Sequence, residues 1–283
     1  MFFKISDILF KMHKKRKQYN REKRLKFAQN YIKNPALVRK LLNKAELKKT
    51  DTVLEIGPGE GIFTAELLKR VKKLIAIEID AENISLLKKR FKNEINEGKL
   101  ILIHQDALAF DKKLEFKKLN INDYKIVASI PYNISSQIFK RFLLRKPFPL
   151  QAYFTVQKEF AKRALNSKGE LFGVFLNSFY SASILHEFKR EDFSPKPAVD
   201  SVFISLKLKE LDAEFLEHLG EYKNLLQKAF VQPIKSTKSF FSDILPDKTL
   251  QRFVDSRKLK LKDKVNNLSS QDWLEIFKII LHS

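Results

Sequence analysis

The sequence predicts an α/β fold, with an open parallel sheet in the larger part of the chain and a small all-helical domain at the C-terminus. Between residues 52 and 130, short β-rich runs alternate with amphipathic helical segments. Such alternation is typical of βαβ units whose sheet is covered by helices on both faces. After about Leu208 the strand signals stop, and the rest of the sequence has the apolar period of helices.

The elements follow one another in the order that this fold requires. Pro35 opens the first helical segment, and apolar residues then recur at helical spacing. Two late strands are expected to close the sheet. The predicted helices cover residues 34–47, 61–71 and 81–95, and the predicted strands cover residues 52–57, 73–80, 100–106, 124–130, 151–157 and 201–208.

The net charge of +22 over 283 residues exceeds what solubility requires and indicates a polyanionic partner, with nucleic acid ahead of an anionic membrane. A Lys-rich genome would also raise the charge, but it would do so evenly. Residues 4–26 instead hold ten Lys or Arg against two acidic residues, whereas the segment after Leu208 mixes both signs. We therefore predict a basic arm over residues 1–26, a sheet-containing domain over 27–208 and a helical domain over 209–283.

The composition also excludes several classes of protein. The chain has no cysteine, so it has neither a disulfide framework nor a cysteine-based zinc site, which fits a reducing cytosol. No apolar run approaches the roughly 20 residues that span a bilayer. Lys4 and Asp7 interrupt the apolar start, and no small-residue cleavage site follows it. We expect a cytoplasmic protein with no metal and no membrane partner.

A glycine-rich loop, "GPGEG", follows a predicted strand and precedes a predicted helix. In that context glycines let the backbone approach a ligand, and the helix N-terminus faces a negative group. Gly57, Gly59 and Gly61 give the spacing G-x-G-x-G, and Ile62 stands where a dinucleotide fingerprint has its third glycine. A plain tight turn is the alternative for the loop alone. Glu78 ends the next strand and adds a carboxylate that can accept the ribose hydroxyls of NAD or S-adenosylmethionine.

Asp106 follows the third predicted strand at the same edge of the sheet, where open α/β folds bind ligands. Its carboxylate can accept a hydrogen bond from an exocyclic amine such as that of adenine. Alone, Asp106 is explained as readily by a helix N-cap before Ala107. However, Gly57, Glu78 and Asp106 come at three successive strand ends, and three independent caps explain that pattern less well.

The fourth strand breaks at "SIPY", which begins at Ser129. Pro131 fixes the turn and removes a donor, so the carbonyls of Ser129 and Ile130 are left to accept hydrogen bonds. Tyr132 offers a flat face beside them. This arrangement suits a planar ring with an amino group, because stacking holds the ring while hydrogen bonds direct the nitrogen at a methyl donor. A strand-ending turn with a packing tyrosine is the alternative.

Seven segments, in this order and spacing, resemble the rRNA adenine N6-dimethyltransferases, and the resemblance runs from about Phe27 to the C-terminus. It implies a Rossmann-like, S-adenosylmethionine-dependent methyltransferase domain over residues 27–208. It also implies that the helical domain over 209–283 binds RNA and that an adenosine of rRNA is the substrate. The segments are "QNYI" (29–32), "LEIGPGEG" (54–61), "IEID" (77–80), "HQDAL" (104–108), "SIPYNISS" (129–136), "VQKEFAKR" (156–163) and "FSPKPAVDS" (193–201).

The resemblance also implies roles for individual residues. Cofactor contacts are implied for Gln29, Asn30, Ile32, Gly57, Gly59, Gly61, Glu78, Asp106, Ala107 and Ser129. The motif around the target base is implied for Ser129, Ile130, Pro131, Tyr132 and Phe193. In that motif Phe193 packs on the flipped base from the side opposite Tyr132, and simple core packing is the alternative for it.

One residue departs from the family pattern, because Ser129 stands where the family usually has Asn. If the backbone carbonyl is the essential acceptor, as we expect, the change has little effect. The segments "IPYN" and "VQKEFA" and the high charge resemble the erythromycin-resistance (Erm) type, which acts on 23S rRNA and blocks the binding of macrolides, lincosamides and streptogramin B. The alternatives are the housekeeping type, which acts on 16S rRNA, and a non-enzymatic RNA-binding relative. We expect a monomer whose basic arm holds rRNA phosphates.

Overall fold

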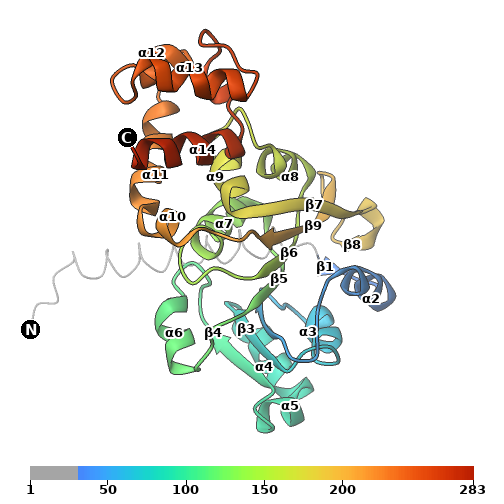
Figure 1. Cartoon of the computed structure of the whole chain (residues 1–283). Helices are drawn as coiled ribbons and strands as arrows, with labels where there is room; N and C mark the ends of the chain where they lie inside the picture. Colours follow the sequence, from blue (N-terminus) through green and yellow to red (C-terminus); the bar gives the residue numbers. More distant parts are fainter. Residues whose placement is uncertain (1–30) are drawn as a thin grey trace, which may run out of the picture.

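A seven-stranded sheet forms the centre of the molecule in the structure, a computed structural model that describes residues 31–283 (Figure 1). The strand order is β4-β3-β2-β5-β6-β9-β7. Five strands run parallel, from β4 to β6, and β9 pairs antiparallel with both β6 and β7. The bounds are β2 (Thr52–Ile56), β3 (Lys73–Glu78), β4 (Leu100–His104), β5 (Lys125–Ser129), β6 (Gln151–Gln157), β7 (Tyr180–Glu187) and β9 (Ser201–Leu208).

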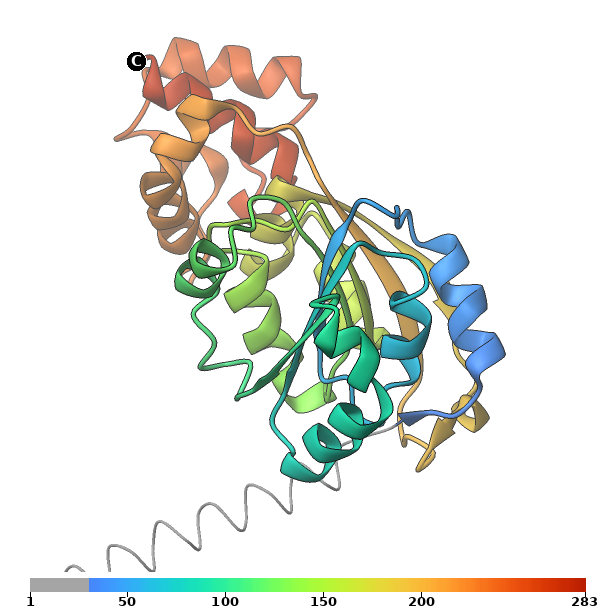
Figure 2. The same cartoon turned by 90° about the horizontal axis from the view of Figure 1, so that it is seen from below.

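Helices cover the two faces of this sheet, as Figure 2 shows. One apolar cluster joins the sheet to α2, α3 and α4, and the other joins its opposite face to α6, α7, α8 and α9. The bounds are α2 (Pro35–Lys44), α3 (Ile62–Leu67), α4 (Ala81–Arg90), α5 (Lys92–Asn96), α6 (Lys112–Lys118), α7 (Ser135–Phe142), α8 (Lys158–Leu165) and α9 (Leu171–Phe179). Because both faces are covered, the parallel strands are rich in apolar residues and do not alternate between apolar and polar ones.

The expected α/β architecture with its parallel sheet is confirmed, and all six predicted strands are present. The seventh strand, β7, was not predicted. It pairs only with β9, so it is one of the two edge strands of the sheet, and several of its polar residues are exposed. The helix expected over residues 81–95 is divided into α4 and α5 at Phe91, whose φ of −115° leaves the helical region.

Only helices follow β9 in the described part of the chain. They are α10 (Ala213–Glu217), α11 (Leu219–Ala229), α12 (Thr237–Phe241), α13 (Asp247–Ser256) and α14 (Ser270–Leu281), with a short 3-10 helix at Val265–Asn267. These helices pack on α9: Phe215 lies 5.8 Å from Phe179 between ring centroids, and the Tyr222 and Ser178 hydroxyl oxygens are 2.6 Å apart. The apolar core is therefore continuous across Leu208, where the sequence placed a domain boundary.

A second, two-stranded sheet pairs β1 (Tyr31–Ile32) with β8 (Phe193–Ser194) in antiparallel fashion. Its register sets Ile32 opposite Phe193, although the two residues are far apart in the sequence. The predicted basic arm (1–26) and the site residues Gln29 and Asn30 lie outside the described residues. Within residues 31–283, the helices are too short or too polar to cross a membrane.

Candidate active site

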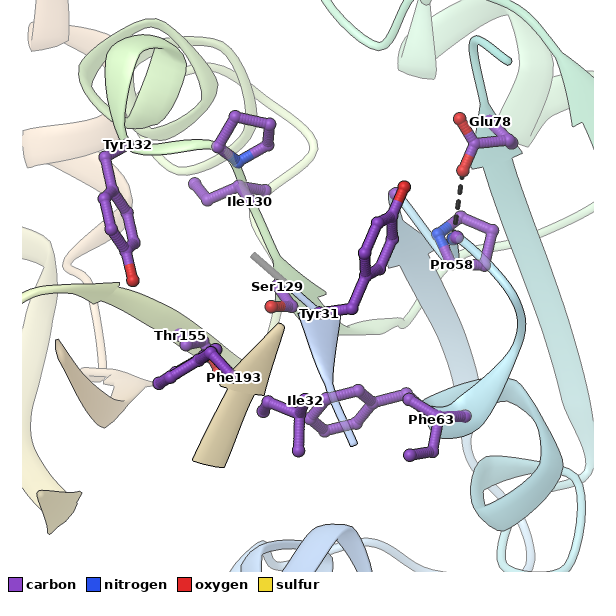
Figure 3. Close-up of a pocket in the computed structure, with 14 residues that line it drawn as sticks. Tyr31, Ile32, Pro58, Phe63, Glu78, Ser129, Ile130, Tyr132, Thr155 and Phe193 are labelled. Carbon is purple, nitrogen blue, oxygen red and sulfur yellow. Dashed lines mark hydrogen bonds between the residues drawn. The ribbon is translucent and has the colours of Figure 1, made fainter. Parts of the chain in front are cut away.

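A cleft opens at the carboxyl ends of β2, β3, β5 and β6, beside the β1–β8 ribbon (Figure 3). It contains about 620 Å³ of space not filled by protein atoms, part of it open to solvent. This is the edge at which open α/β sheets bind ligands. Its walls are formed by Tyr31, Ile32, Gly57, Pro58, Gly59, Ile62, Phe63, Glu78, Ser129, Ile130, Pro131, Tyr132, Thr155 and Phe193.

The glycine loop after β2 has a backbone conformation that residues with a side chain rarely adopt. Gly57 and Gly59 have φ of +70° and +55°, in the left-handed region that other residues rarely adopt. A Cβ on Gly59 would stand 2.6 Å from Cε1 of Tyr31. A Cβ on Gly57 would stand 3.7 Å from the carbonyl oxygen of Ser129, so the end of β5 directly borders the loop. The loop thus keeps a cradle of bare backbone open.

The carboxylate of Glu78, at the end of β3, is buried and held by three backbone N–H groups. Gly59 N donates to Oε2 at 3.0 Å, and the nitrogens of Ile79 and Asp80 donate to Oε1 at 2.7 and 2.9 Å. These bonds tie the glycine loop to β3 and fix the carboxylate in one orientation. Each carboxylate oxygen has two acceptor sites, so Oε2 keeps capacity for a ligand hydroxyl in the cleft.

A second carboxyl group, that of Glu55 on β2, lies beneath the loop and was not singled out in the sequence. It is 2% exposed, and the Thr64 hydroxyl donates to its Oε2 at 2.8 Å. Burial raises the pKa of the Glu55 carboxyl to about 8, and the nearby charge of Glu78 adds to that rise. Glu55 is therefore mainly protonated at neutral pH and joins β2 to α3 as a neutral group.

On the opposite side of the cleft, β5 ends at Ser129 and the chain turns at Pro131 into a 3-10 helix, Tyr132–Ile134. The Tyr132 hydroxyl and the hydroxyl of Ser201 on β9 are 2.5 Å apart. Burial raises the pKa of Tyr132, so its hydroxyl stays neutral and can act as donor or acceptor in this pair. The bond fixes one end of the ring and leaves the ring to line the cleft.

The sequence allowed Phe193 to be either a core residue or a wall of the site, and the structure shows features of both. Its side chain is 1% exposed and packs edge-to-face on Phe188, with ring centroids 5.0 Å apart. It also lines the cleft, because pairing of β8 with β1 sets it against Ile32 (Figure 3). A buried ring at a cleft wall is held rigidly, which suits it to contact a planar ligand.

The structure brings most of the predicted site residues to one cleft. The residues that line it are Ile32, Gly57, Gly59, Glu78, Ser129, Ile130, Pro131, Tyr132 and Phe193. Three predicted residues are not in its wall. Gly61 is the residue before α3, and Asp106 lies two residues past the end of β4, where its Oδ1 accepts from the nitrogen of Leu108. Ala107 packs against the core of the other sheet face. This bond, and the one from the nitrogen of Ala109 to the carbonyl oxygen of Asp106 at 2.8 Å, close a turn over residues 106–109 in which no helix begins, so the cofactor contact of Asp106 stays a prediction.

Five wall residues were not predicted: Tyr31, Pro58, Ile62, Phe63 and Thr155. Tyr31 and Pro58 lie inside the quoted motifs, and Ile62 and Phe63 directly follow the glycine loop. Thr155 is different, because it sits in the apolar strand "QAYFTVQ", where a lone hydroxyl was the only signal. Its Oγ1 is buried and has no hydrogen-bond partner among residues 31–283.

Comparison with known proteins gives consistent matches over most of the chain. The family described as "Ribosomal RNA adenine dimethylase" matches residues 20–282. The "rRNA adenine N-6-methyltransferase" of Streptococcus sanguinis is 36% identical over 185 residues, which are 65% of this chain and 71% of that protein. The "Ribosomal RNA small subunit methyltransferase A" of Helicobacter hepaticus is 30% identical over 268 residues, 93% of this chain and 92% of that protein. A crystal structure of a dimethyladenosine transferase from Plasmodium falciparum has a TM-score of 0.69 and 28% identity, covering 89% of this chain and 97% of that one.

Proposed function

The chain belongs to the ribosomal RNA adenine dimethylase family, the S-adenosylmethionine-dependent rRNA adenine N6-methyltransferases, and we propose that its target is an adenosine of 23S rRNA. The same proposal assigns methyl transfer to the cleft between the glycine loop and the turn at Pro131. The observation that carries it is the junction at Ser129, because the end of β5 borders the glycine loop on one side and continues into the Tyr132 turn on the other.

In this proposal the glycine loop and Glu78 hold the cofactor. Gly57 and Gly59 line the cleft and carry no side chain, so a ligand can approach their backbone closely. The oriented Glu78 carboxylate has capacity for a ribose hydroxyl. When bound, S-adenosylmethionine supplies an electrophilic methyl group, and the bonding electrons leave with its sulfur.

The turn at Pro131 would hold the target base. Tyr132 and Phe193 both line this side of the cleft, so a flipped adenine could stack on the Tyr132 ring and contact the buried Phe193 ring at the wall. Acceptors on Ser129 and Ile130 take hydrogen bonds from the adenine amino group and direct its lone pair to the methyl carbon. Catalysis is then mainly positioning. The methylated nitrogen loses its proton to water, so no strong general base is needed.

The choice of 23S rRNA is supported by sequence features. The segments "IPYN" and "VQKEFA" and the net charge of +22 are the features that resemble the erythromycin-resistance type. Methylation of 23S rRNA would give resistance to macrolides, lincosamides and streptogramin B. On this proposal, expression of the chain in a sensitive bacterium raises the inhibitory concentration of all three drug classes.

A second candidate target is 16S rRNA. It is favoured by the match to a small-subunit methyltransferase, which extends over 93% of this chain and 92% of that protein. The non-enzymatic alternative has no comparable support, because the matching family is described as a dimethylase.

Primer extension on both rRNAs, from cells with and without the gene, tests the proposal. A methylation-dependent stop confined to 23S rRNA supports it. A stop confined to 16S rRNA overturns the 23S proposal in favour of the second candidate. No stop on either rRNA, together with undetectable calorimetric binding of S-adenosylmethionine, would overturn the assignment of methyl transfer to this cleft.

A further inference from the structure

Two hydroxyl groups stand side by side on the floor of the cleft without a hydrogen bond. Ser129 and Thr155 are register partners on the parallel strands β5 and β6, so their side chains leave the same face of the sheet. Both line the cleft. Among residues 31–283, neither hydroxyl has a hydrogen-bond partner. Figure 3 draws both on the side of Tyr132 and Phe193, across from Glu78.

The Thr155 hydroxyl cannot be satisfied by solvent, because its oxygen is buried and the residue is 1% exposed. Native proteins rarely leave a buried polar group without a partner, since the loss of hydration is then uncompensated. Phe203 is its register partner on the other side, on β9, and has no polar side-chain atom to offer. Ser129 is the polar side chain that the register places next to it.

The orientation of Ser129 indicates which of its oxygens can reach a ligand in the cleft. Its carbonyl oxygen faces Gly57 in the neighbouring loop, whereas its side chain projects from the sheet into the cleft. A hydroxyl can accept a hydrogen bond from an amino group only if its own hydrogen points elsewhere. An amide oxygen has no such requirement, because it is always an acceptor. Ser129 therefore needs a second acceptor that takes its hydrogen.

We infer that the Ser129 hydroxyl, in place of the backbone carbonyl expected from the sequence, accepts from the target amino group. Thr155 is then a positioning residue, whose Oγ1 accepts the hydrogen of the Ser129 hydroxyl and turns its lone pairs towards that amino group. Side chains of register partners on neighbouring strands, which lie about 4.8 Å apart, are adjacent on one face of the sheet, and the bond would form through a change of side-chain rotamer. The inference rests on the proposed function, since it refines how the cleft holds the target adenine. It also explains how serine serves at this position.

The test is a mutant cycle with purified full-length protein, measured as the single-turnover rate of methyl transfer from tritiated S-adenosylmethionine to unmethylated 23S rRNA and to small ribosomal subunits. Thr155→Val keeps the shape and removes the hydroxyl, and it should lower the rate roughly 10- to 100-fold. Thr155→Ser keeps the hydroxyl and should stay within about threefold of wild type. The Kd of S-adenosylmethionine should change by less than about threefold in both variants.

Ser129→Asn separates positioning from structure. In that background Thr155→Val should change the rate by less than about threefold, because an amide oxygen needs no help to accept. Thr155→Val should not lower the melting temperature, since the hydroxyl it removes has no partner in the folded protein. Equal losses from Thr155→Val in both backgrounds, or no loss in either, would overturn the inference while leaving the proposed function intact.

Wild-type activity distinguishes the remaining outcomes. An inactive wild type with an active Ser129→Asn variant would overturn the inference, because Ser129 would then not be a competent acceptor, but it would support the proposed site. Inactivity of both proteins towards both RNAs would overturn the proposed function and the inference with it.

Discussion

The two halves of the cleft differ in how completely the protein satisfies its own polar groups. In the proposed cofactor half, formed by the glycine loop and Glu78, the Glu78 carboxylate already accepts three backbone N–H groups, and Glu55 is bonded to Thr64. In the proposed target half, around Ser129 and Tyr132, the hydroxyls of Ser129 and Thr155 have no partner within residues 31–283. The internal hydrogen bonds therefore hold the first half in one conformation. In the second half, hydroxyl groups are left that can form hydrogen bonds when a ligand is bound.

The largest expected effect tests the rigid half. Gly59→Ala should raise the Kd of S-adenosylmethionine roughly 100-fold, because the new Cβ would stand 2.6 Å from the Tyr31 ring and displace the loop from its cradle. Isothermal titration calorimetry measures this directly. Gly98→Ala is the matched control, since Gly98 also has a positive φ but has no atom within 4 Å of the new Cβ. Similar losses of cofactor affinity in both variants would attribute the effect to backbone strain.

The next effect tests the open half. Tyr132→Ala should lower turnover roughly 10- to 100-fold, because the variant loses one stacking face for the target base. The Kd of S-adenosylmethionine should stay within about threefold of wild type, since Tyr132 lies across the cleft from Glu78 (Figure 3). Single-turnover assays measure the rate of methyl transfer, and calorimetry measures the Kd of S-adenosylmethionine. A parallel loss of turnover and of cofactor affinity would mean that the tyrosine is structural.

A pH experiment addresses the neutral carboxyl beneath the glycine loop. Burial raises the pKa of Glu55 from 4.5 to about 8. Between pH 4.5 and pH 8, the carboxyl is therefore protonated in the folded state and ionised in the unfolded state. Its contribution to stability is fully present below about pH 4.5 and is lost as the pH rises towards 8. The free energy of unfolding of Glu55→Gln should therefore rise relative to that of wild type as the pH increases through this range, by a few kcal/mol at most.

Urea unfolding of both proteins at several pH values measures that difference. A constant difference in the free energy of unfolding from pH 5 to pH 8.5 would show that Glu55 does not titrate in the folded protein in this range.

The smallest effect concerns the hydrogen bond between the hydroxyls of Tyr132 and Ser201 in the proposed target half. Tyr132→Phe removes the hydroxyl that pairs with Ser201 and should lower turnover only about two- to tenfold, because the ring remains to stack. Ser201→Ala should behave alike, and the double variant should be no slower than either single variant. If the fold-loss of turnover in the double variant equals the product of the two single losses, the two hydroxyls do not act as a pair.

The sequence predicted the parallel sheet and most of the cleft wall because those features are local. A glycine loop after a strand, a carboxylate at the end of the next strand and a proline break at Ser129 are each recognisable from a few neighbouring residues. The edge strand β7 was missed because alanine and serine are weak strand formers and a bulge between Ile184 and His186 breaks its alternation. For Asp106 the local pattern fits both a cofactor contact and a carboxylate that closes a turn, so its role at the cofactor stays a prediction.

What the sequence determined by itself is therefore the set of strand ends and the chemistry of the residues on them, since periodicity, glycine and proline act over short distances. Only the tertiary structure decided which of these residues meet. Pairing of β1 with β8 brings Ile32 to Phe193, the β5–β6 register sets Ser129 beside Thr155, and β9 supplies Ser201 to Tyr132. These contacts join distant segments, so they depend on strand order and register, which follow from how the whole core packs.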